Sequence, residues 1–405
     1  MNQRDLSLQQ FPLNVPRPGR ILFLLLSRLR HGRLDVVVPG GQTLSFLGEL
    51  SGPDAQIQLA DWSTLGDVMR SGDVGFAEGY IDGRWDTPDL AALLHLCAIN
   101  RGGLNRALYG SWLGRLYYRL RHLRRANTRE GAKRNIHAHY DLGNDFYRSW
   151  LDRSMTYSSA LFHGRPGITL EEAQMAKYER ILSALGARRT DTVLEIGCGW
   201  GGFAEYAART RGCRVRGITL SAAQLEYGHK RLREAGLSDL VELSLTDYRD
   251  VTGRFDYVVS IEMFEAVGER FWPAYFQVVR DRLKPGGRAM IQTITIAEEL
   301  FGDYRRGTDF IQQYVFPGGM LPSAAAFRRQ VRQAGLETVE QLSFGGDYAE
   351  TLRHWRQRYG QVAGSLRAQG FDARFERLWN FYLAYCEAGF RAGSTDVMQA
   401  ELRRA

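Results

Sequence analysis

The sequence has few of the features that mark secreted, membrane-spanning or metal-binding proteins. Its 405 residues contain only four cysteines, Cys97, Cys198, Cys213 and Cys386, and their spacing suits neither a zinc site nor a set of disulfides. The apolar run 21–26 is far too short to span a bilayer. No signal peptide is evident. We therefore expect a cytoplasmic protein without a bound metal.

Acidic residues are outnumbered by basic ones, 45 against 53, which gives a net charge of +8. This excess indicates an anionic partner, either nucleic acid, a phospholipid surface or an acidic metabolite. The charge is densest at 114–134, where tyrosines and leucines lie between the arginines. Such a segment suits an anionic membrane surface, although a solvated linker helix has the same composition. Since no nucleic-acid-binding motif accompanies it, we expect no nucleic-acid partner.

The chain is long enough for two domains, and its hydrophobic content of 44% supports real cores. Residues 1–19 are mostly polar and contain several prolines, which predicts a flexible tail. Residues 34–60 hold short apolar runs separated by glycine and proline, which predicts an antiparallel β unit. With the helical stretch after it, this unit predicts a small α+β N-terminal domain at 20–125. The run 21–26 fits a buried core helix and a membrane-facing helix equally well.

From about residue 170 onward, short apolar runs alternate with helical patterns, starting with a helix at 169–186. The predicted strands are 192–196, 214–219, 241–245, 255–260 and 287–293. This alternation predicts a doubly wound α/β domain at 126–405, with a parallel sheet covered by helices on both faces. A ligand is then expected at the carboxyl ends of the strands. An aromatic insertion at 296–325 predicts a substrate lid.

A glycine-rich turn follows the first of these strands. Gly197, Gly199 and Gly202 have dinucleotide-binding spacing, but that signal is weak alone. A nicotinamide enzyme should carry an acid about 20 residues on, yet the second strand ends in Gly-Ile-Thr at 217–219. The acid Glu195, just before the turn, instead resembles the first loop of the class I S-adenosylmethionine (SAM) methyltransferases.

Several motifs together resemble the cyclopropane-fatty-acyl-phospholipid synthase family, a branch of the SAM methyltransferases. They are 139–147 (HYDLGNDFY), 155–160 (MTYSSA), 194–202 (LEIGCGWGG), 217–224 (GITLSAAQ), 263–268 (MFEAVG), 314–323 (YVFPGGMLPS) and 346–348 (GDY). The motifs span about 135–360, and 78–83 (EGYIDG) also resembles the N-terminal part of the bacterial phospholipid enzymes. The resemblance implies SAM as the methyl donor and a dimer formed through the N-terminal domain.

The resemblance also assigns residues to the donor site. They are Tyr157, Ser158, Glu195, Gly197, Gly199, Gly201, Thr219, Leu220, Gln224, Asp247 and Tyr248. The three glycines would admit the amino-acid end of SAM to the backbone, and Glu195 would orient the loop or the ammonium group. Thr219, Leu220 and Gln224 would replace the missing ribose acid. Glu195 equally fits a buried acid that caps neighbouring amides, and Tyr157 fits simple core packing.

For the base, the resemblance implies a bound bicarbonate held by a cysteine, a glutamate, a histidine, an isoleucine backbone and a tyrosine. Glu265, Ile294 and Tyr348 match this set, whereas Ser159 replaces the cysteine and Gln292 the histidine. A serine still donates a hydrogen bond, but an amide cannot titrate, so a proton relay through Gln292 is lost. These two departures argue against bicarbonate and against ring closure.

A second carboxylate, Glu262, lies three residues before Glu265. Paired carboxylates raise the pKa of one partner and can produce a usable base, although Glu262 equally fits a solvated or ion-paired acid. Aromatic faces suited to a carbocation are those of Tyr157, Tyr314, Phe316 and Tyr348. His137 and His139 have no further ligands at metal-binding spacing, so they are interpreted as structural or as lining the substrate entry.

The sequence thus predicts a cytoplasmic enzyme, peripheral on the inner face of the membrane. It would transfer a methyl group from SAM to the cis double bond of an unsaturated phospholipid acyl chain. The resemblance favours a cyclopropane product, and the substitutions at Ser159 and Gln292 favour a methyl-branched one; we lean toward the latter. The alternatives are a SAM methyltransferase of a soluble small molecule and a non-catalytic lipid-binding homologue.

Overall fold

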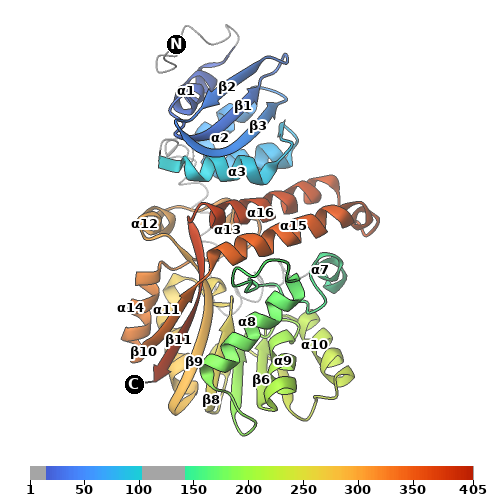
Figure 1. Cartoon of the computed structure of the whole chain (residues 1–405), viewed down its shortest axis with the longest axis vertical. Helices are drawn as coiled ribbons and strands as arrows, with labels where there is room; N and C mark the ends of the chain where they lie inside the picture. Colours follow the sequence, from blue (N-terminus) through green and yellow to red (C-terminus); the bar gives the residue numbers. More distant parts are fainter. Residues whose placement is uncertain (1–14, 103–141, 405) are drawn as a thin grey trace. The chain divides into compact units, whose positions relative to one another are not determined.

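The computed structural model describes residues 15–102 and 142–404. The basic segment 114–134, His137 and His139, and most of the predicted tail lie outside these residues. The chain forms two compact units (Figure 1). Unit 1 comprises Met1–His122, Arg306–Val315 and Ala363–Ser394, and unit 2 comprises Leu123–Arg305, Phe316–Val362 and Thr395–Ala405. The predicted domains are contiguous in sequence, whereas both units are discontinuous.

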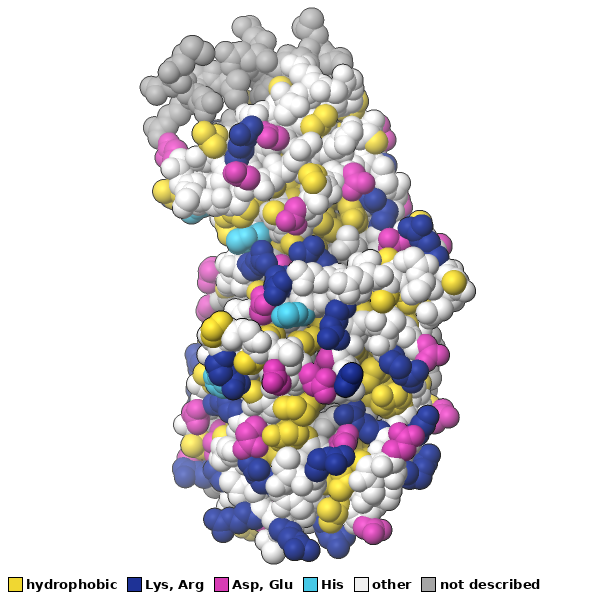
Figure 2. Space-filling model, turned by 45° about the vertical axis from the view of Figure 1, so that its right-hand side comes forward, with side chains coloured by type: hydrophobic (Ala, Val, Ile, Leu, Met, Phe, Trp, Pro, Cys, Tyr) yellow, Lys and Arg dark blue, Asp and Glu magenta, His cyan; other side chains and the backbone are white. Residues whose placement is uncertain are grey.

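The face shown in Figure 2 carries charges of both signs. On the face seen in Figure 2, Lys and Arg side chains lie among Asp and Glu side chains rather than in one patch. Within residues 15–102 and 142–404, no helix is both long enough and apolar enough to cross a membrane.

Unit 1 contains a four-stranded sheet of order β2-β1-β3-β4. Its strands are β1 (His31–Val37), β2 (Thr43–Leu47), β3 (Leu50–Leu59) and β4 (Trp85–Asp86). β1 pairs antiparallel with β2 but parallel with β3, so the expectation of an antiparallel unit was wrong for that pair. Between β2 and β3 the chain crosses the start of β1 at Gly48, whose amide donates to Gly32 O at 2.7 Å. The chain therefore reaches the opposite edge of β1 and runs alongside it in the same direction.

Among the described residues, five helices lie wholly in unit 1. They are α1 (Arg17–Leu26), α2 (Ser63–Ile81), α3 (Leu90–Ile99), α13 (Phe310–Tyr314) and α16 (Ala373–Arg391). Of these, α3 packs against β1 and β3. In α1, Phe23 is fully buried while Ile21 is 48% exposed, so the run 21–26 contributes one face to the core. The Arg377 guanidinium lies 3.9 Å from the centre of the Tyr80 ring, which attaches α16 to α2.

Unit 2 contains a seven-stranded sheet of order β10-β11-β9-β8-β5-β6-β7. Its strands are β5 (Thr192–Ile196), β6 (Arg214–Thr219), β7 (Val241–Leu245), β8 (Phe255–Ile261), β9 (Leu283–Ile296), β10 (Leu336–Ser343) and β11 (Thr395–Arg404). The first five are parallel, as predicted, and β9 extends beyond its predicted ends. β11 pairs antiparallel with both β9 and β10, and neither β10 nor β11 was predicted.

The helices that follow lie wholly or mostly in unit 2, and the last residues of α15 belong to unit 1. They are α7 (Asn144–Trp150), α8 (Leu170–Leu185), α9 (Gly202–Arg211), α10 (Ala222–Glu234), α11 (Trp272–Arg282), α12 (Glu298–Arg306), α14 (Ala324–Gln333) and α15 (Gly345–Ala368). Of these, α11 and α14 cover one face of the sheet and α8 and α9 the other (Figure 1). Thr169 and Glu172 form a capping box that starts α8, and Gly186 with φ +65° ends it. The α/β fold class predicted from the sequence is confirmed.

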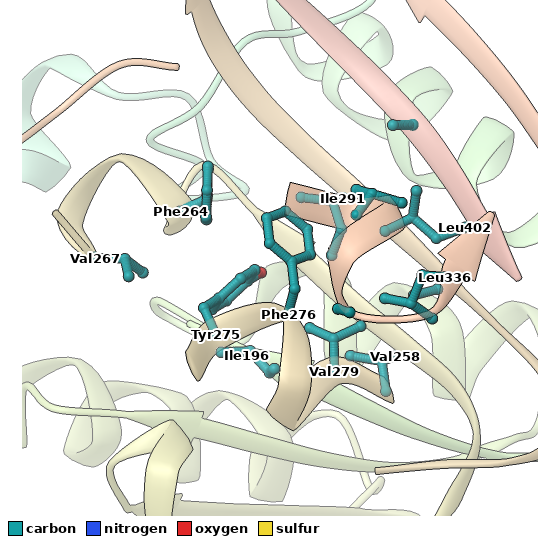
Figure 3. Packing of buried hydrophobic residues seen from close by; sticks show 14 of the residues in the cluster. Ile196, Val258, Phe264, Val267, Tyr275, Phe276, Val279, Ile291, Leu336 and Leu402 are labelled. Atoms are coloured by element: carbon teal, nitrogen blue, oxygen red, sulfur yellow. The ribbon is translucent and has the colours of Figure 1, made fainter. Parts of the chain in front are cut away.

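Two hydrophobic clusters lie on opposite faces of this sheet, because neighbouring residues of one strand point to opposite sides. Leu194 and Val258 belong to the cluster under α11 and α14, whereas Val193 and Val259 belong to the cluster under α8 and α9. Figure 3 shows part of the first cluster, where side chains of α11 lie against strand residues such as Ile291. Burial on both faces fixes the register of the strands, and with it the positions of the loops at their carboxyl ends.

Candidate active site

The glycine-rich turn joins β5 to α9 and has the backbone that the spacing predicts. Gly197, Gly199 and Gly201 have φ of +87°, +51° and +81°, a region that favours glycine. The amides of Gly197 and Cys198 donate to Ile218 O at 3.0 and 2.9 Å, which fixes the turn to the end of β6. A methyl group at Gly199 would meet no described atom within 4 Å. The turn therefore offers open backbone to a ligand.

Glu195 is the penultimate residue of β5 and is 3% exposed. Its Oε2 atom is buried and has no hydrogen-bond partner within residues 15–102 and 142–404. Burial raises the pKa of Glu195 to about 8, although the charges of Lys177 and Arg231 oppose that rise. A buried carboxyl oxygen without a partner, beside an open turn, fits the ammonium group of a bound amino acid, and the positive charge of that group would favour the ionised form of Glu195.

The residues after β6 form a small hydrogen-bonded turn. The Thr219 hydroxyl donates to Gln224 Oε1 at 2.9 Å, and Leu220 between them is half-buried. Ser221 caps α10 by accepting a hydrogen bond from the Gln224 amide at 3.3 Å. Thr219, Leu220 and Gln224 are therefore brought together at the carboxyl end of β6, next to the turn after β5.

Asp247 and Tyr248 follow β7 in the sheet. The Arg249 side chain donates to both oxygens of Asp247, at 2.8 and 2.6 Å, so this carboxylate already has a cationic partner. The Tyr248 ring packs against Tyr275 with centroids 5.6 Å apart, and burial raises the pKa of Tyr248 to about 12. The assignment of Asp247 and Tyr248 to the donor site stays a prediction.

Tyr157 and Ser158 lie in the loop before α8. The half-buried Tyr157 ring packs against the rings of Tyr147, Trp150 and Trp355 at centroid distances of 5.4, 5.6 and 5.3 Å. Core packing therefore accounts for part of the Tyr157 side chain and leaves the rest accessible. The hydroxyl of the buried Ser158 accepts a 2.6 Å hydrogen bond from Lys177 Nζ.

Four of the predicted catalytic residues meet at the Glu262 carboxylate. Its Oε1 atom accepts hydrogen bonds from the Ser159 amide at 2.8 Å and from Gln292 Nε2 at 2.7 Å. Its Oε2 atom accepts from the Tyr348 hydroxyl at 2.6 Å. Ser159 and Gln292 are fully buried, whereas part of Glu262 remains accessible. The sequence indicated these four residues as candidates, but it did not predict that three of them donate hydrogen bonds to the fourth.

The other two predicted residues form a second, neighbouring group around Glu265. Its Oε1 atom accepts hydrogen bonds from the Ile294 amide and from the Thr293 hydroxyl, the latter at 2.9 Å. Its Oε2 atom is buried and finds no partner in the described part of the chain. Burial and the charge of Glu262 together raise the pKa of Glu265 to about 8. Glu265 therefore holds its proton near neutral pH.

The two carboxylates and the glycine turn share one edge of the sheet. Glu262 follows β8 and Gly197 follows β5, and these strands are parallel neighbours. A methyl group at Gly197 would lie 2.8 Å from Met263 Cγ, so the two loops are in close contact. Tyr314, by contrast, lies in unit 1, where its hydroxyl donates to Glu78.

Sequence reasoning missed Lys177, which lies on α8 and is completely buried. Its Nζ atom donates to Ser158 Oγ and, at 2.7 Å, to Gln174 Oε1. Desolvation lowers the pKa of Lys177 to about 7, against the attraction of nearby carboxylates, first among them Glu262. Helical spacing could have found this residue, because Lys177 shares the buried face of α8 with Ala173.

A second missed residue, Gln399, lies in the middle of β11 and is fully buried. Its Nε2 atom donates to Gln292 Oε1 at 2.9 Å. Its Oε1 atom accepts from Arg180 at 2.6 Å, and Arg180 also donates to Glu340 at 2.7 Å. A chain of oriented polar groups therefore runs from the rim of the sheet to Glu262. The signal in the sequence is weak, an amide between the apolar residues Met398 and Ala400.

Residues 127–400 match the family model described as mycolic acid cyclopropane synthetase. The chain belongs to this family. It is 42% identical over 345 residues to the tuberculostearic acid methyltransferase UfaA1 of Mycobacterium tuberculosis, covering 83% of this chain and 80% of that protein. It is 34% identical over 341 residues to the cyclopropane-fatty-acyl-phospholipid synthase of Escherichia coli, covering 83% and 85%. The family predicted from the sequence motifs is confirmed.

Solved structures agree with this assignment. The mycolic acid cyclopropane synthase CmaA1, crystallised with SAH and CTAB, is 31% identical, with a TM-score of 0.63 and coverage of 67% of this chain and 98% of that one. Coclaurine N-methyltransferase, at 18% identity and a TM-score of 0.61, shares the fold. The chain is thus a SAM-dependent methyltransferase of a lipid-modifying family, and Gly199 and Glu195 fit the donor by their open backbone and unsatisfied oxygen.

Proposed function

We propose that this protein transfers a methyl group from SAM to the cis double bond of an unsaturated phospholipid acyl chain. The observation that carries the proposal is the pair of carboxylates, Glu262 and Glu265, at the same sheet edge as the turn at Gly197. Related proteins named for tuberculostearic acid and for fatty-acyl phospholipids support a lipid acyl chain as the substrate. The product is a methyl-branched or a cyclopropane acyl chain.

The chain supplies the groups that this reaction requires. Bound SAM provides an electrophilic methyl group, whose transfer to the alkene π electrons leaves a carbocation on the acyl chain. The rings of Tyr157 and Tyr348, which both pack against Trp355, are suited to stabilise that cation. A carboxylate of the buried pair is suited to accept the proton that must then leave. The acyl chain would approach the Gly197 turn from the accessible side of Glu262.

The residues present do not fit a bound bicarbonate. The donors that the resemblance assigns to it include the groups at Ser159, Gln292 and Tyr348, and all three already donate to Glu262. A second anion there would face the negative charge of Glu262 at short range without a free donor from this set.

The reaction is tested by incubating the protein with SAM and vesicles of a monounsaturated phospholipid. We expect mass spectrometry of the acyl chains to show the gain of one methylene unit, and saturated phospholipid to remain unchanged. Cyclopropane and methyl-branched alkene are isomers, so proton NMR must separate them. An absence of mass gain on every lipid tested would contradict the proposal. Repeating the analysis with Ser159→Cys and Gln292→His together tests whether these positions set the product.

The proposal includes docking on the inner face of an anionic membrane. The net charge of +8 and the basic segment 114–134 support it, although that segment lies outside the described residues. We expect the protein to co-sediment with vesicles that contain phosphatidylglycerol, and added salt to release it because salt screens the attraction. Equal sedimentation with neutral vesicles would contradict an electrostatic contribution. The dimer also stays a prediction.

A further inference from the structure

We propose that the Glu262 carboxylate is the base of this enzyme and occupies the anion position that the family resemblance assigns to bicarbonate. This inference rests on the proposed methyl transfer to an acyl chain. It adds that the base is built into the chain, so that turnover requires no dissolved anion.

Three donors from separate parts of the fold converge on Glu262. The Ser159 amide comes from the loop before α8, Gln292 Nε2 from β9 and the Tyr348 hydroxyl from α15, at 2.8, 2.7 and 2.6 Å. Convergent donors of this kind are what holds an anion in a protein. Here the anion that the three donors hold is the Glu262 carboxylate, which is part of the chain and cannot diffuse away between turnovers.

The backbone conformation at Glu262 also indicates that this side chain has a function. Glu262 has φ +50°, a region that favours glycine, while its amide donates to Gln292 O at 2.8 Å. A side chain larger than glycine's is strained there and persists only where the surroundings hold it. A glycine at this position would relieve the strain and would leave the three donors free for a dissolved anion.

The electrostatics divide the pair into a base and a neutral acid. Burial raises the pKa of Glu262, but Lys177 of α8 and the donors Tyr348 and Gln292 all favour its ionised form. The charge of Glu262 is one reason why the pKa of Glu265 is about 8. The three donors on its two oxygens favour Glu262 as the anion of the pair, Glu265 is the proton holder, and Lys177 lies near enough to favour the charge of Glu262.

The proton step balances without an oxidant or reductant. The new C–C bond takes the alkene π electrons, and the electron pair of the broken S–C bond stays on sulfur. One proton then leaves the acyl cation for a Glu262 oxygen, and its C–H electron pair closes either a C=C bond or a cyclopropane bond. One proton is released to solvent for each methyl group transferred.

The test compares wild type, Glu262→Gln and Glu262→Gly in buffers stripped of carbon dioxide. We expect wild-type turnover to be unchanged by stripping. We expect Glu262→Gln to lose about 100-fold or more in kcat while its affinity for SAH stays within about twofold. Glu262→Gly should be equally slow, and sodium bicarbonate or sodium acetate should restore its turnover with saturation.

A binding measurement separates this inference from the proposed reaction. We expect ¹³C-bicarbonate NMR to show line broadening with Glu262→Gly and none with wild type. Bicarbonate binding to wild type as tight as to the glycine variant would overturn the inference, and so would full activity of Glu262→Gln. If wild type methylates no lipid, the proposed reaction fails, while the binding comparison still decides whether Glu262 fills the anion position.

Discussion

Gln399 Nε2 donates a 2.9 Å hydrogen bond to Gln292 Oε1, and this contact decides which end of the Gln292 amide faces Glu262. With its oxygen held by Gln399, Gln292 turns its NH₂ group toward the carboxylate. Arg180 fixes Gln399 in turn by donating to its Oε1 atom at 2.6 Å. The orientation of a residue at the reaction centre is thus set from the neighbouring strand.

Replacing Gln399 by Glu should reverse this orientation at nearly constant volume. A carboxylate only accepts hydrogen bonds, so Gln292 would turn its NH₂ group toward residue 399 and its oxygen toward Glu262. We expect kcat to fall by about 10- to 100-fold, with KM and the affinity for SAH unchanged. The Gln399→Met variant, which loses the bond without reversing it, should be affected less. A parallel loss of kcat and thermal stability in both variants would indicate a structural role only.

Replacing Gly199 by Ala should weaken binding of the donor, because a methyl group would fill the open backbone of the turn. Gly236 is the matched control, since it has φ +67° and equally open surroundings but lies after α10. We expect calorimetric titration with SAH to show about tenfold weaker binding for Gly199→Ala and less than a twofold change for Gly236→Ala. Equal effects of both substitutions would show that backbone strain, and not the loss of space for the donor, causes the weaker binding of SAH.

Replacing Lys177 by Met should shift the pH dependence of turnover. The positive charge of Lys177 favours the ionised form of Glu262, so its removal should raise the pKa of Glu262 further. We expect the acid limb of the kcat/KM profile to move to higher pH, by about one unit. Lys230→Met, at an exposed position on α10, is the control. An unchanged acid limb in Lys177→Met would show that Glu262 does not determine it.

Replacing Glu265 by Gln should change how stability depends on pH. The pKa of Glu265 is raised from 4.5 to about 8 on folding, so the folded state binds more protons than the unfolded state between these values. The corresponding stability is fully present below pH 4.5 and is lost as the pH rises through 8, about 5 kcal/mol in all.

Glutamine does not titrate, so Glu265→Gln should lose less stability than wild type between pH 5 and pH 8. Thermal unfolding at the two pH values measures the difference, with the exposed Glu299→Gln as control. Parallel curves for Glu265→Gln and wild type would contradict the raised pKa.

The five parallel strands of the unit 2 sheet were predictable because each includes a short apolar run next to a glycine or a helical pattern. Strand β10 escaped prediction because most of its side chains are at least partly exposed, and β11 because polar residues such as Gln399 and Glu401 interrupt it. Both strands acquire their pairing only from the tertiary fold. The parallel pairing of β1 with β3 likewise depends on the crossing at Gly48, a contact between residues that spacing alone does not bring together.

The residues of the candidate site were selected by resemblance, but their arrangement was not. The resemblance placed Ser159, Gln292 and Tyr348 in one group, and it could not show that all three donate to Glu262. Lys177 and Gln399 were missed because buried polar residues within apolar patterns are read as part of the core. What they do depends on side-chain geometry, which only the structure supplies.

The position of β11 has a consequence for biosynthesis. This strand carries Gln399 and pairs between β9 and β10, although it is made after both of them. A nascent chain emerging from the ribosome therefore exposes the unpaired edge of β9 until β11 is translated. The hydrogen bond from Gln399 to Gln292 forms only after that point, and a chain that still lacks β11 presents an open sheet edge, which favours aggregation.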